Sequence, residues 1–122
     1  MELSNKKDER KFTRASKSLA VEYHEDKKHG ELIRTFMMDI SVGGGCLITY
    51  CGYKPGQVLV VRISIPVNPE EWVDVRGRVV ESLRKSNYKY STRMEFVDLN
   101  HNQKNLIQEF VKRVHFVKEL KK

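Results

Sequence analysis

The chain has 122 residues, of which 39% are hydrophobic and 32% are charged, and its formal net charge at pH 7 is +7. This length suffices for one domain with one core, and the composition is too apolar for an intrinsically disordered protein. No apolar run approaches the roughly 20 residues of a membrane-spanning helix, and the first residues lack the apolar core of a signal peptide. We therefore expect a cytoplasmic protein without membrane insertion, whose positive charge favours an anionic partner.

The first segment of the chain is polar and basic. Residues 1–9 show no periodicity and are predicted to form a flexible tail before a single domain over residues 10–122. Arg10 and Arg14 follow, with Lys11 between them, and in an extended segment the two arginines would lie about 13 Å apart. A guanidinium group donates paired hydrogen bonds to phosphate oxygens or to the O6 and N7 acceptors of guanine.

Six segments are rich in β-branched residues or alternate between apolar and polar residues, and turn-forming residues separate them. These predicted strands cover residues 19–23, 31–41, 46–50, 57–65, 72–83 and 88–97. Gly77 lies on the apolar face of the fifth strand, between Val75 and Val79, and predicts a bend or bulge there. Short connections between six antiparallel strands predict a small β-barrel over about residues 15–97.

The last segment has the periodicity of a helix. Asn100 and Gln103 have the spacing of a capping box, in which each residue caps the other at the start of a helix. The apolar residues that follow recur at helical spacing: Leu106, Ile107, Phe110, Val111, Val114 and Val117. We predict a C-terminal helix over about residues 101–120 that packs on the barrel through this apolar stripe.

Three consecutive glycines, Gly43 to Gly45, follow the second predicted strand. Glycine weakens a strand, so we expect these residues to serve a turn or the close approach of another group to the backbone, and not packing. Asp39 and Ser41 are two residues apart, so in a strand both side chains point to one face, at the rim of the sheet. This layout suits a small polar binding site, although the motif alone is more often a strand followed by a glycine-rich turn.

No group of residues has the spacing of a catalytic or metal site. The four histidines fall in different predicted elements, and Ser41 has no base beside it in the sequence. Cys46 and Cys51 have no metal-ligand spacing, and Cys46 is predicted to be a small core residue. The sequence therefore predicts a protein that is not an enzyme and holds no metal or cofactor.

The two polar features complement each other. Asp39 can accept hydrogen bonds from N1 and N2 of guanine, and Ser41 can bind a phosphate or order a water molecule, while Gly44 permits close approach. Together with the arginines Arg10 and Arg14, these residues would recognise a guanine nucleotide by both its base and its phosphate.

The segments 10–14 and 39–44 resemble the Arg-x-x-x-Arg and Asp/Asn-x-Ser-x-x-Gly motifs of PilZ domains, which are bacterial receptors for cyclic di-GMP. The resemblance extends over about residues 9–120 and implies a six-stranded antiparallel β-barrel with a C-terminal α-helix packed on it. It implies that Arg10 and Arg14 clamp the ligand while Asp39, Ser41 and Gly44 hold its other side. Further candidate ligand-binding residues are Lys11, Gly43 and Arg93.

Two residues depart from the pattern of this family. Glu9 precedes the first motif arginine where family members often have another arginine, which favours one ligand molecule over a stacked pair. Arg93 stands in the last strand where the family usually has glycine, and it could crowd the rim of the barrel or add a cation near the ligand.

The resemblance predicts a cyclic di-GMP receptor that acts as an adapter, with an N-terminal arginine segment that orders on binding and an unidentified effector protein as its partner. One alternative is a PilZ-like protein that has lost ligand binding and works through protein contacts alone. The other is a basic β-barrel that binds single-stranded nucleic acid by stacking. A nucleic-acid partner is less favoured, because it does not explain Asp39 beside the glycines.

Overall fold

The computed structural model describes residues 18–25, 32–66 and 71–120, with side chains described as far as Val114. Six strands and one helix make up this part of the chain. They are β1 (Leu19–Glu25), β2 (Ile33–Ser41), β3 (Gly44–Thr49), β4 (Val58–Ile65), β5 (Glu71–Ser86), β6 (Lys89–Val97) and α2 (His101–Leu120). The six predicted strands and the predicted helix are therefore confirmed.

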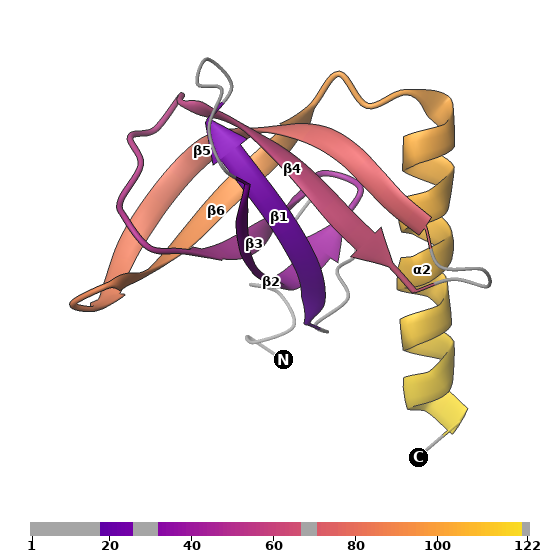
Figure 1. The fold of residues 1–122 in the computed structure, drawn as a ribbon. Coiled ribbons are helices and arrows are strands. Elements are labelled where there is room, and N and C mark those ends of the chain that lie inside the picture. The colour runs from indigo at the N-terminus through magenta and orange to yellow at the C-terminus, as the bar shows by residue number, and fades with distance from the viewer. Residues whose placement is uncertain (1–17, 26–31, 67–70, 121–122) are drawn as a thin grey trace, which may run out of the picture.

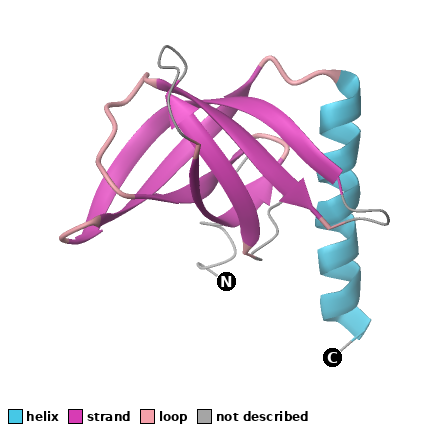
Figure 2. Ribbon diagram, in the orientation of Figure 1, coloured by secondary structure: helices cyan, strands magenta, loops and turns pink. Residues whose placement is uncertain are grey.

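The six strands form a closed barrel in the order β1-β2-β3-β6-β5-β4 (Figure 1). Every neighbouring pair is antiparallel, and the pairing of β1 with β4 closes the barrel. Closure leaves no unpaired sheet edge along most of the wall, which removes a site of edge-to-edge aggregation. Helix α2 stands against one end of this barrel (Figure 2).

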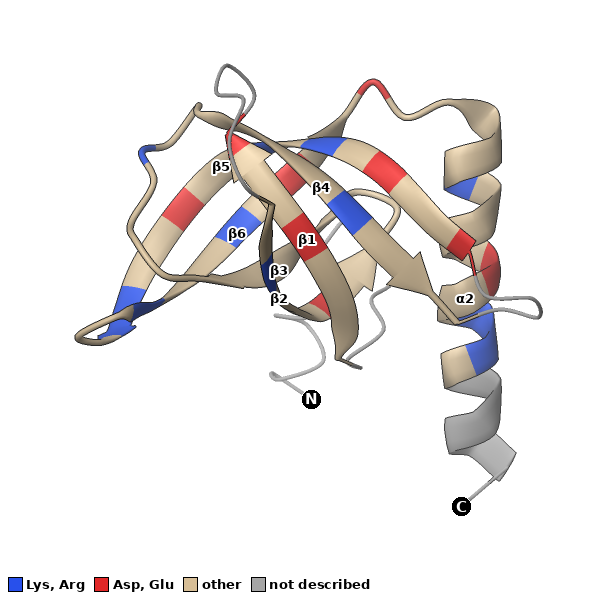
Figure 3. Cartoon of the chain, in the orientation of Figure 1, with Lys and Arg blue, Asp and Glu red and all other residues tan. Residues whose placement is uncertain are grey.

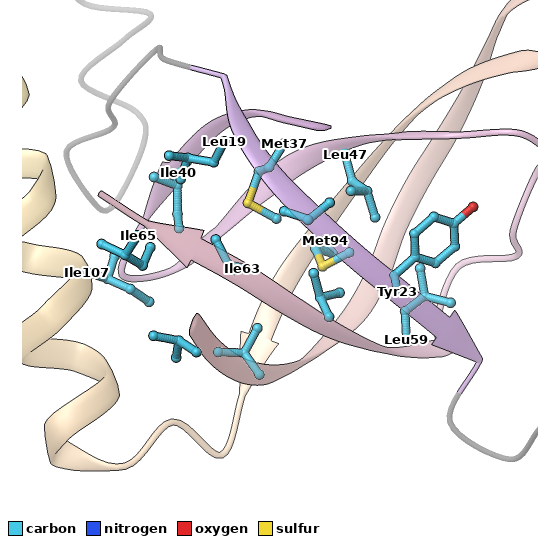
Figure 4. Packing of buried hydrophobic residues seen from close by; sticks show 14 of the residues in the cluster. Leu19, Tyr23, Met37, Ile40, Leu47, Leu59, Ile63, Ile65, Met94 and Ile107 are labelled. Atoms are coloured by element: carbon cyan, nitrogen blue, oxygen red, sulfur yellow. The ribbon is translucent and has the colours of Figure 1, made fainter. Parts of the chain in front are cut away.

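The barrel interior is filled by alternate residues of every strand, as period-2 geometry requires. Ile40, Ile65 and the helix residue Ile107 meet at the end of the barrel that α2 covers, and all three side chains are fully buried (Figure 4). Phe110 and Val111 extend the buried helical stripe, and Leu106 and Val114 pack partly buried against the core, so the predicted packing face is confirmed as far as Val114. The side chain of Val117, the last residue of the predicted stripe, lies outside the described part. No helix in the described chain is long and apolar enough to cross a membrane.

The opposite end of the interior is more polar. The Thr92 hydroxyl lies 2.8 Å from the hydroxyl oxygen of Thr49 and 2.7 Å from that of Ser82, so three strands are joined by a chain of hydrogen bonds. The rings of Tyr23 and Tyr53 meet edge to face, with centroids 6.2 Å apart. Burial raises the pKa of both phenols above the ordinary value, so both stay neutral at physiological pH.

The start of α2 has the predicted capping box. The backbone N–H of Gln103 donates to Oδ1 of Asn100 at 2.8 Å, and the backbone N–H of Asn100 donates to Oε1 of Gln103 at 2.7 Å. The side-chain amide of Gln103 also donates to the backbone carbonyl of Asp74 on β5. One residue therefore caps the helix and ties it to the barrel wall.

The prediction of a bulge at Gly77 is wrong, while a bend there stays a prediction. The register of β5 against β6 shifts between Val79 and Glu81, three residues further on. A Cβ atom at position 77 would overlap the side chain of Met94 inside the barrel. Gly77 is therefore explained by packing against the large side chain of Met94, with the bulge placed elsewhere in the strand.

Replacing Ile107 by alanine tests the packing of α2 on the barrel. We expect Ile107→Ala to lower the free energy of unfolding by about 3 kcal/mol, because it leaves a cavity where a fully buried side chain was. Urea denaturation followed by circular dichroism measures this change. Lys112→Ala, an exposed position on the same helix, is the control and should change stability by less than about 0.5 kcal/mol; equal effects of the two substitutions would contradict the described packing.

Candidate ligand-binding site

A β-bulge in β2 determines where the polar residues of this strand point. Thr35 and Met37 face the interior, but the register against β3 shifts by one residue between Met37 and Asp39. Ile40 therefore returns to the core. Asp39 and Ser41 pair with Cys46 and Gly44, which in turn pair with the outward-facing Arg93 and Glu95, so both side chains take the outer side of the wall. The prediction that Asp39 and Ser41 share a face is confirmed. The bulge itself was not predicted, since the apolar Met38 at this position gives no signal of it.

The hydroxyl of Ser41 is engaged within its own turn. It accepts a hydrogen bond from the backbone N–H of Gly43 at 3.1 Å and donates one to the carbonyl of Gly44 at 3.3 Å. Only 4% of Ser41 is exposed. The Ser41 hydroxyl therefore stabilises the turn between β2 and β3.

The expected close approach of other groups to the glycine backbone is confirmed at Gly44 and Gly45. These groups belong to neighbouring strands, so the expectation that the glycines do not serve packing is wrong. Gly44 pairs with Glu95, and a Cβ atom on it would overlap the backbone carbonyl of Met94. A Cβ atom on Gly45 would lie 2.6 Å from the backbone carbonyl oxygen of Asp39 and 2.9 Å from the sulfur of Met37. Both glycines thus lie within β3, and close approach of β2 and β6 excludes a side chain at either position.

Four residues form a row across the outer face of four strands, which we call the outer row. Asp39 pairs with Cys46, Cys46 pairs with Arg93, and Arg93 pairs with Glu81. Cys46 is half-buried and is not a member of the core cluster, so the prediction of Cys46 as a core residue is wrong. Its sulfur lies 2.9 Å from the hydroxyl oxygen of Ser91. Asp39 and Arg93 are two strands apart, about 10 Å between backbones.

The cations of this face are paired with carboxylates. Nη2 of Arg93 donates to Oε2 of Glu81 at 3.0 Å, and Nη1 of Arg78 donates to Oε1 of Glu95 at 3.1 Å. About half of each side chain is exposed to solvent. Exposed pairs of this kind contribute about 0.2–1 kcal/mol, so a bound anion could displace the carboxylates at little cost.

The structure gathers part of the predicted site. Asp39, Ser41, Gly43 and Gly44 lie on the β2–β3 hairpin, and Arg93 lies on the adjacent strand β6. The remaining predicted residues, Arg10, Lys11 and Arg14, lie outside the described residues.

The start of β1 lies beside the β2–β3 hairpin. Leu19 is the first residue of β1 and pairs with Met37, two residues before Asp39 in β2. The segment that precedes Leu19 is therefore joined to the barrel beside the candidate site.

A closed six-stranded antiparallel barrel with one C-terminal helix is the fold of PilZ domains. The sequence profile of the PilZ domain family matches residues 8–113, so the chain belongs to this family. PilZ domains are non-catalytic receptors for cyclic di-GMP.

Solved structures have the same fold. The inhibitor of motility MotI/DgrA from Bacillus subtilis superposes with a TM-score of 0.71 and 20% identity, over 85% of this chain and 50% of that one. The PilZ domain of YcgR from Escherichia coli, solved with c-di-GMP, has a TM-score of 0.66 and 11% identity, over 92% of this chain and 95% of that one. The MrkH–c-di-GMP complex of K. pneumonia has a TM-score of 0.71 and 16% identity, over 93% of this chain and 55% of that one.

The chain thus spans about half the length of the MotI/DgrA and MrkH chains and nearly all of the isolated PilZ domain of YcgR. A comparison with curated protein sequences finds no match.

Replacing Gly44 by alanine tests whether this glycine serves packing. We expect Gly44→Ala to destabilise the ligand-free protein by about 3 kcal/mol or more, because the new Cβ atom must push β3 away from β6. Urea denaturation without ligand measures the effect. If the variant kept its full stability and lost only ligand binding, Gly44 would serve the ligand and our explanation would be wrong.

Proposed function

We propose that residues 10–122 act as one cytoplasmic receptor domain for cyclic di-GMP, which binds between the outer face of the β2–β3 hairpin and the N-terminal arginines. The observation that carries this proposal is the bulge in β2, which presents Asp39 on the outer face beside the start of β1. Membership of the PilZ family supports the choice of ligand.

The candidate residues have different roles in this proposal. Asp39 accepts hydrogen bonds from N1 and N2 of one guanine, while Arg10 and Arg14 bind phosphate oxygens and stack on guanine. Ser41 positions the turn through its two hydrogen bonds, and Gly44 keeps the hairpin close to β6. Lys11 adds positive charge, and Gly43 leaves the surface of the turn open to the ligand.

The length of the N-terminal segment permits this arrangement. Arg14 is five residues before Leu19, a distance of at most about 17 Å along an extended chain. Because Leu19 pairs with Met37, two residues from Asp39, the Arg14 guanidinium can reach a ligand that contacts Asp39.

Binding produces the signal through order in the N-terminal segment. Two arginines that hold a dianionic ligand against the barrel would create a new surface from the N-terminal segment and the barrel wall. An effector protein that binds this surface, and not the free segment, would couple ligand concentration to output. The domain is therefore an adapter without catalysis of its own.

Titration with cyclic di-GMP tests the proposed site. We expect saturable binding in the micromolar range, and a loss of affinity of at least about tenfold in each of Arg10→Ala, Arg14→Ala and Asp39→Ala, since each removes hydrogen bonds to a charged group. Isothermal titration calorimetry measures the affinity and the number of ligand molecules per domain. Glu9 favours one molecule.

The control for these variants is Arg34→Ala. Arg34 is an exposed arginine of β2 that pairs with Glu22 on β1, so its loss should leave the affinity unchanged. A parallel titration with single-stranded oligonucleotides addresses the nucleic-acid alternative. The proposal would be contradicted if cyclic di-GMP showed no saturable binding, or if oligonucleotides bound more tightly than cyclic di-GMP and in a salt-dependent way.

Arg93 gives a second test, because the outer row directs it away from the barrel interior. We expect Arg93→Ala to weaken cyclic di-GMP binding by roughly threefold to tenfold, since it removes a cation near the ligand. Glu81→Gln frees Arg93 from its ion pair and should strengthen binding. Tighter binding of Arg93→Ala would show instead that this side chain crowds the ligand.

A further inference from the structure

The hairpin that joins β5 and β6 projects beyond the rest of the barrel (Figure 1). β4 pairs with β5 only as far as Arg78, and β3 pairs with β6 only from Tyr90 onward. The last pairs of the hairpin, Arg84 with Tyr90 and Ser86 with Lys89, therefore stand at or beyond the edge of the wall. We call residues 83–89 the hairpin tip, and every one of them is exposed.

The hairpin tip is a concentration of positive charge. The stretch from Ser82 to Thr92 contains three cations, Arg84, Lys85 and Lys89, and no Asp or Glu. Figure 3 shows Lys and Arg gathered at this projecting end of the molecule. Elsewhere on the barrel several arginines of the described strands pair with acids, as Arg78 does with Glu95 and Arg62 with Asp74.

Arg84 has a structural role in the tip. It donates to the backbone carbonyl of Ser86 at 3.2 Å and to the side chain of Asn87 at 3.1 Å. These hydrogen bonds hold the turn in shape, which leaves Lys85 and Lys89 as the cations that can be changed without altering the turn.

Large apolar and aromatic side chains lie beside these cations. Tyr88 is 71% exposed and Leu83 is 49% exposed. Tyr50 is also exposed and follows Thr49, which pairs with Tyr90 in the neighbouring strand. Single exposed apolar residues are common on protein surfaces, but a tyrosine and a leucine beside lysines on one projecting tip suit the interface between water and lipid.

We propose that the hairpin tip associates peripherally with the surface of an anionic lipid bilayer. Lysines near an anionic leaflet are attracted to the headgroups, while tyrosine and leucine side chains enter the boundary between headgroups and acyl chains. The tip is convex, and a fluid lipid surface adapts to a convex tip, whereas a folded partner would need a matching concave pocket.

This mode of binding is compatible with ligand binding. The tip lies at the opposite end of the barrel from α2 (Figure 1). Lys89 and Glu95 are six residues apart on β6, about 20 Å along the strand, so the outer face near Gly44 stays open to solvent when the tip is on a membrane. The sequence predicted no membrane insertion, and peripheral association of the tip requires none.

Vesicle sedimentation with the full chain tests this proposal. We expect the protein to sediment with vesicles of phosphatidylglycerol and phosphatidylcholine at low salt, and not with phosphatidylcholine alone. The variant Lys85→Glu/Lys89→Glu should bind at least about tenfold more weakly, since each lysine near an anionic surface contributes to binding. Leu83→Ser/Tyr88→Ser should also bind more weakly, although its net charge is unchanged.

The matched control is Lys104→Glu/Lys112→Glu, which makes the same charge change at two exposed positions of α2. It should keep binding within about threefold of the parent protein, and all variants should keep their cyclic di-GMP affinity and thermal midpoint. Failure of the parent protein to sediment with the anionic vesicles would overturn the proposal. An equal loss in the control variant, or unchanged binding of Leu83→Ser/Tyr88→Ser, would also overturn it.

Discussion

One extra residue in β2 decides which side of the barrel wall carries the carboxylate of Asp39. Without the bulge, strict alternation from Met37 would direct Asp39 into an apolar interior and Ile40 to the surface. A buried, unpaired carboxylate costs several kcal/mol, and the core would lose Ile40, which packs beside Ile65 and Ile107 at the helix end. One extra residue in β2 therefore both returns Ile40 to the core and places Asp39 on the outer face.

The hairpin that follows the bulge is held from two sides. Ser41 closes the turn with two hydrogen bonds, and Gly44 allows the backbone of β6 to come close. The backbone N–H of Phe96 donates to the carbonyl of Gly43 at 2.9 Å and continues the ladder between the two strands. The β2–β3 hairpin is therefore a preorganised surface, which lowers the ordering cost for any ligand that contacts it.

The two ends of the barrel differ in polarity: α2 covers the apolar end, and the β5–β6 hairpin projects from the more polar end. At one end α2 seals the interior with apolar side chains. At the other end hydroxyl groups satisfy one another inside, and the projecting hairpin presents Lys85, Lys89 and Tyr88 outside. The ligand-binding proposal concerns the outer face of β2, β3 and β6, and the membrane proposal concerns the hairpin tip, so the two functions can be tested separately.

The sequence by itself determined the features that depend on near neighbours along the chain. Alternation and turn residues predicted the six strands, and helical spacing with the Asn100–Gln103 box predicted α2 and its buried stripe. The Asp39-to-Gly44 motif predicted which residues share the outer face. These predictions succeeded because backbone periodicity and helix capping are local properties.

Only the tertiary structure decided the features that depend on register between strands. Gly45 and Gly77 make room for Met37 and Met94, which are distant in sequence and adjacent across the sheet. Glu81 became the partner of Arg93 through a second bulge in β5. The bulge in β2 placed Asp39 opposite the outward-facing Cys46. A shift of one residue in pairing exchanges the two faces of a strand, and the sequence of either strand alone does not contain that shift.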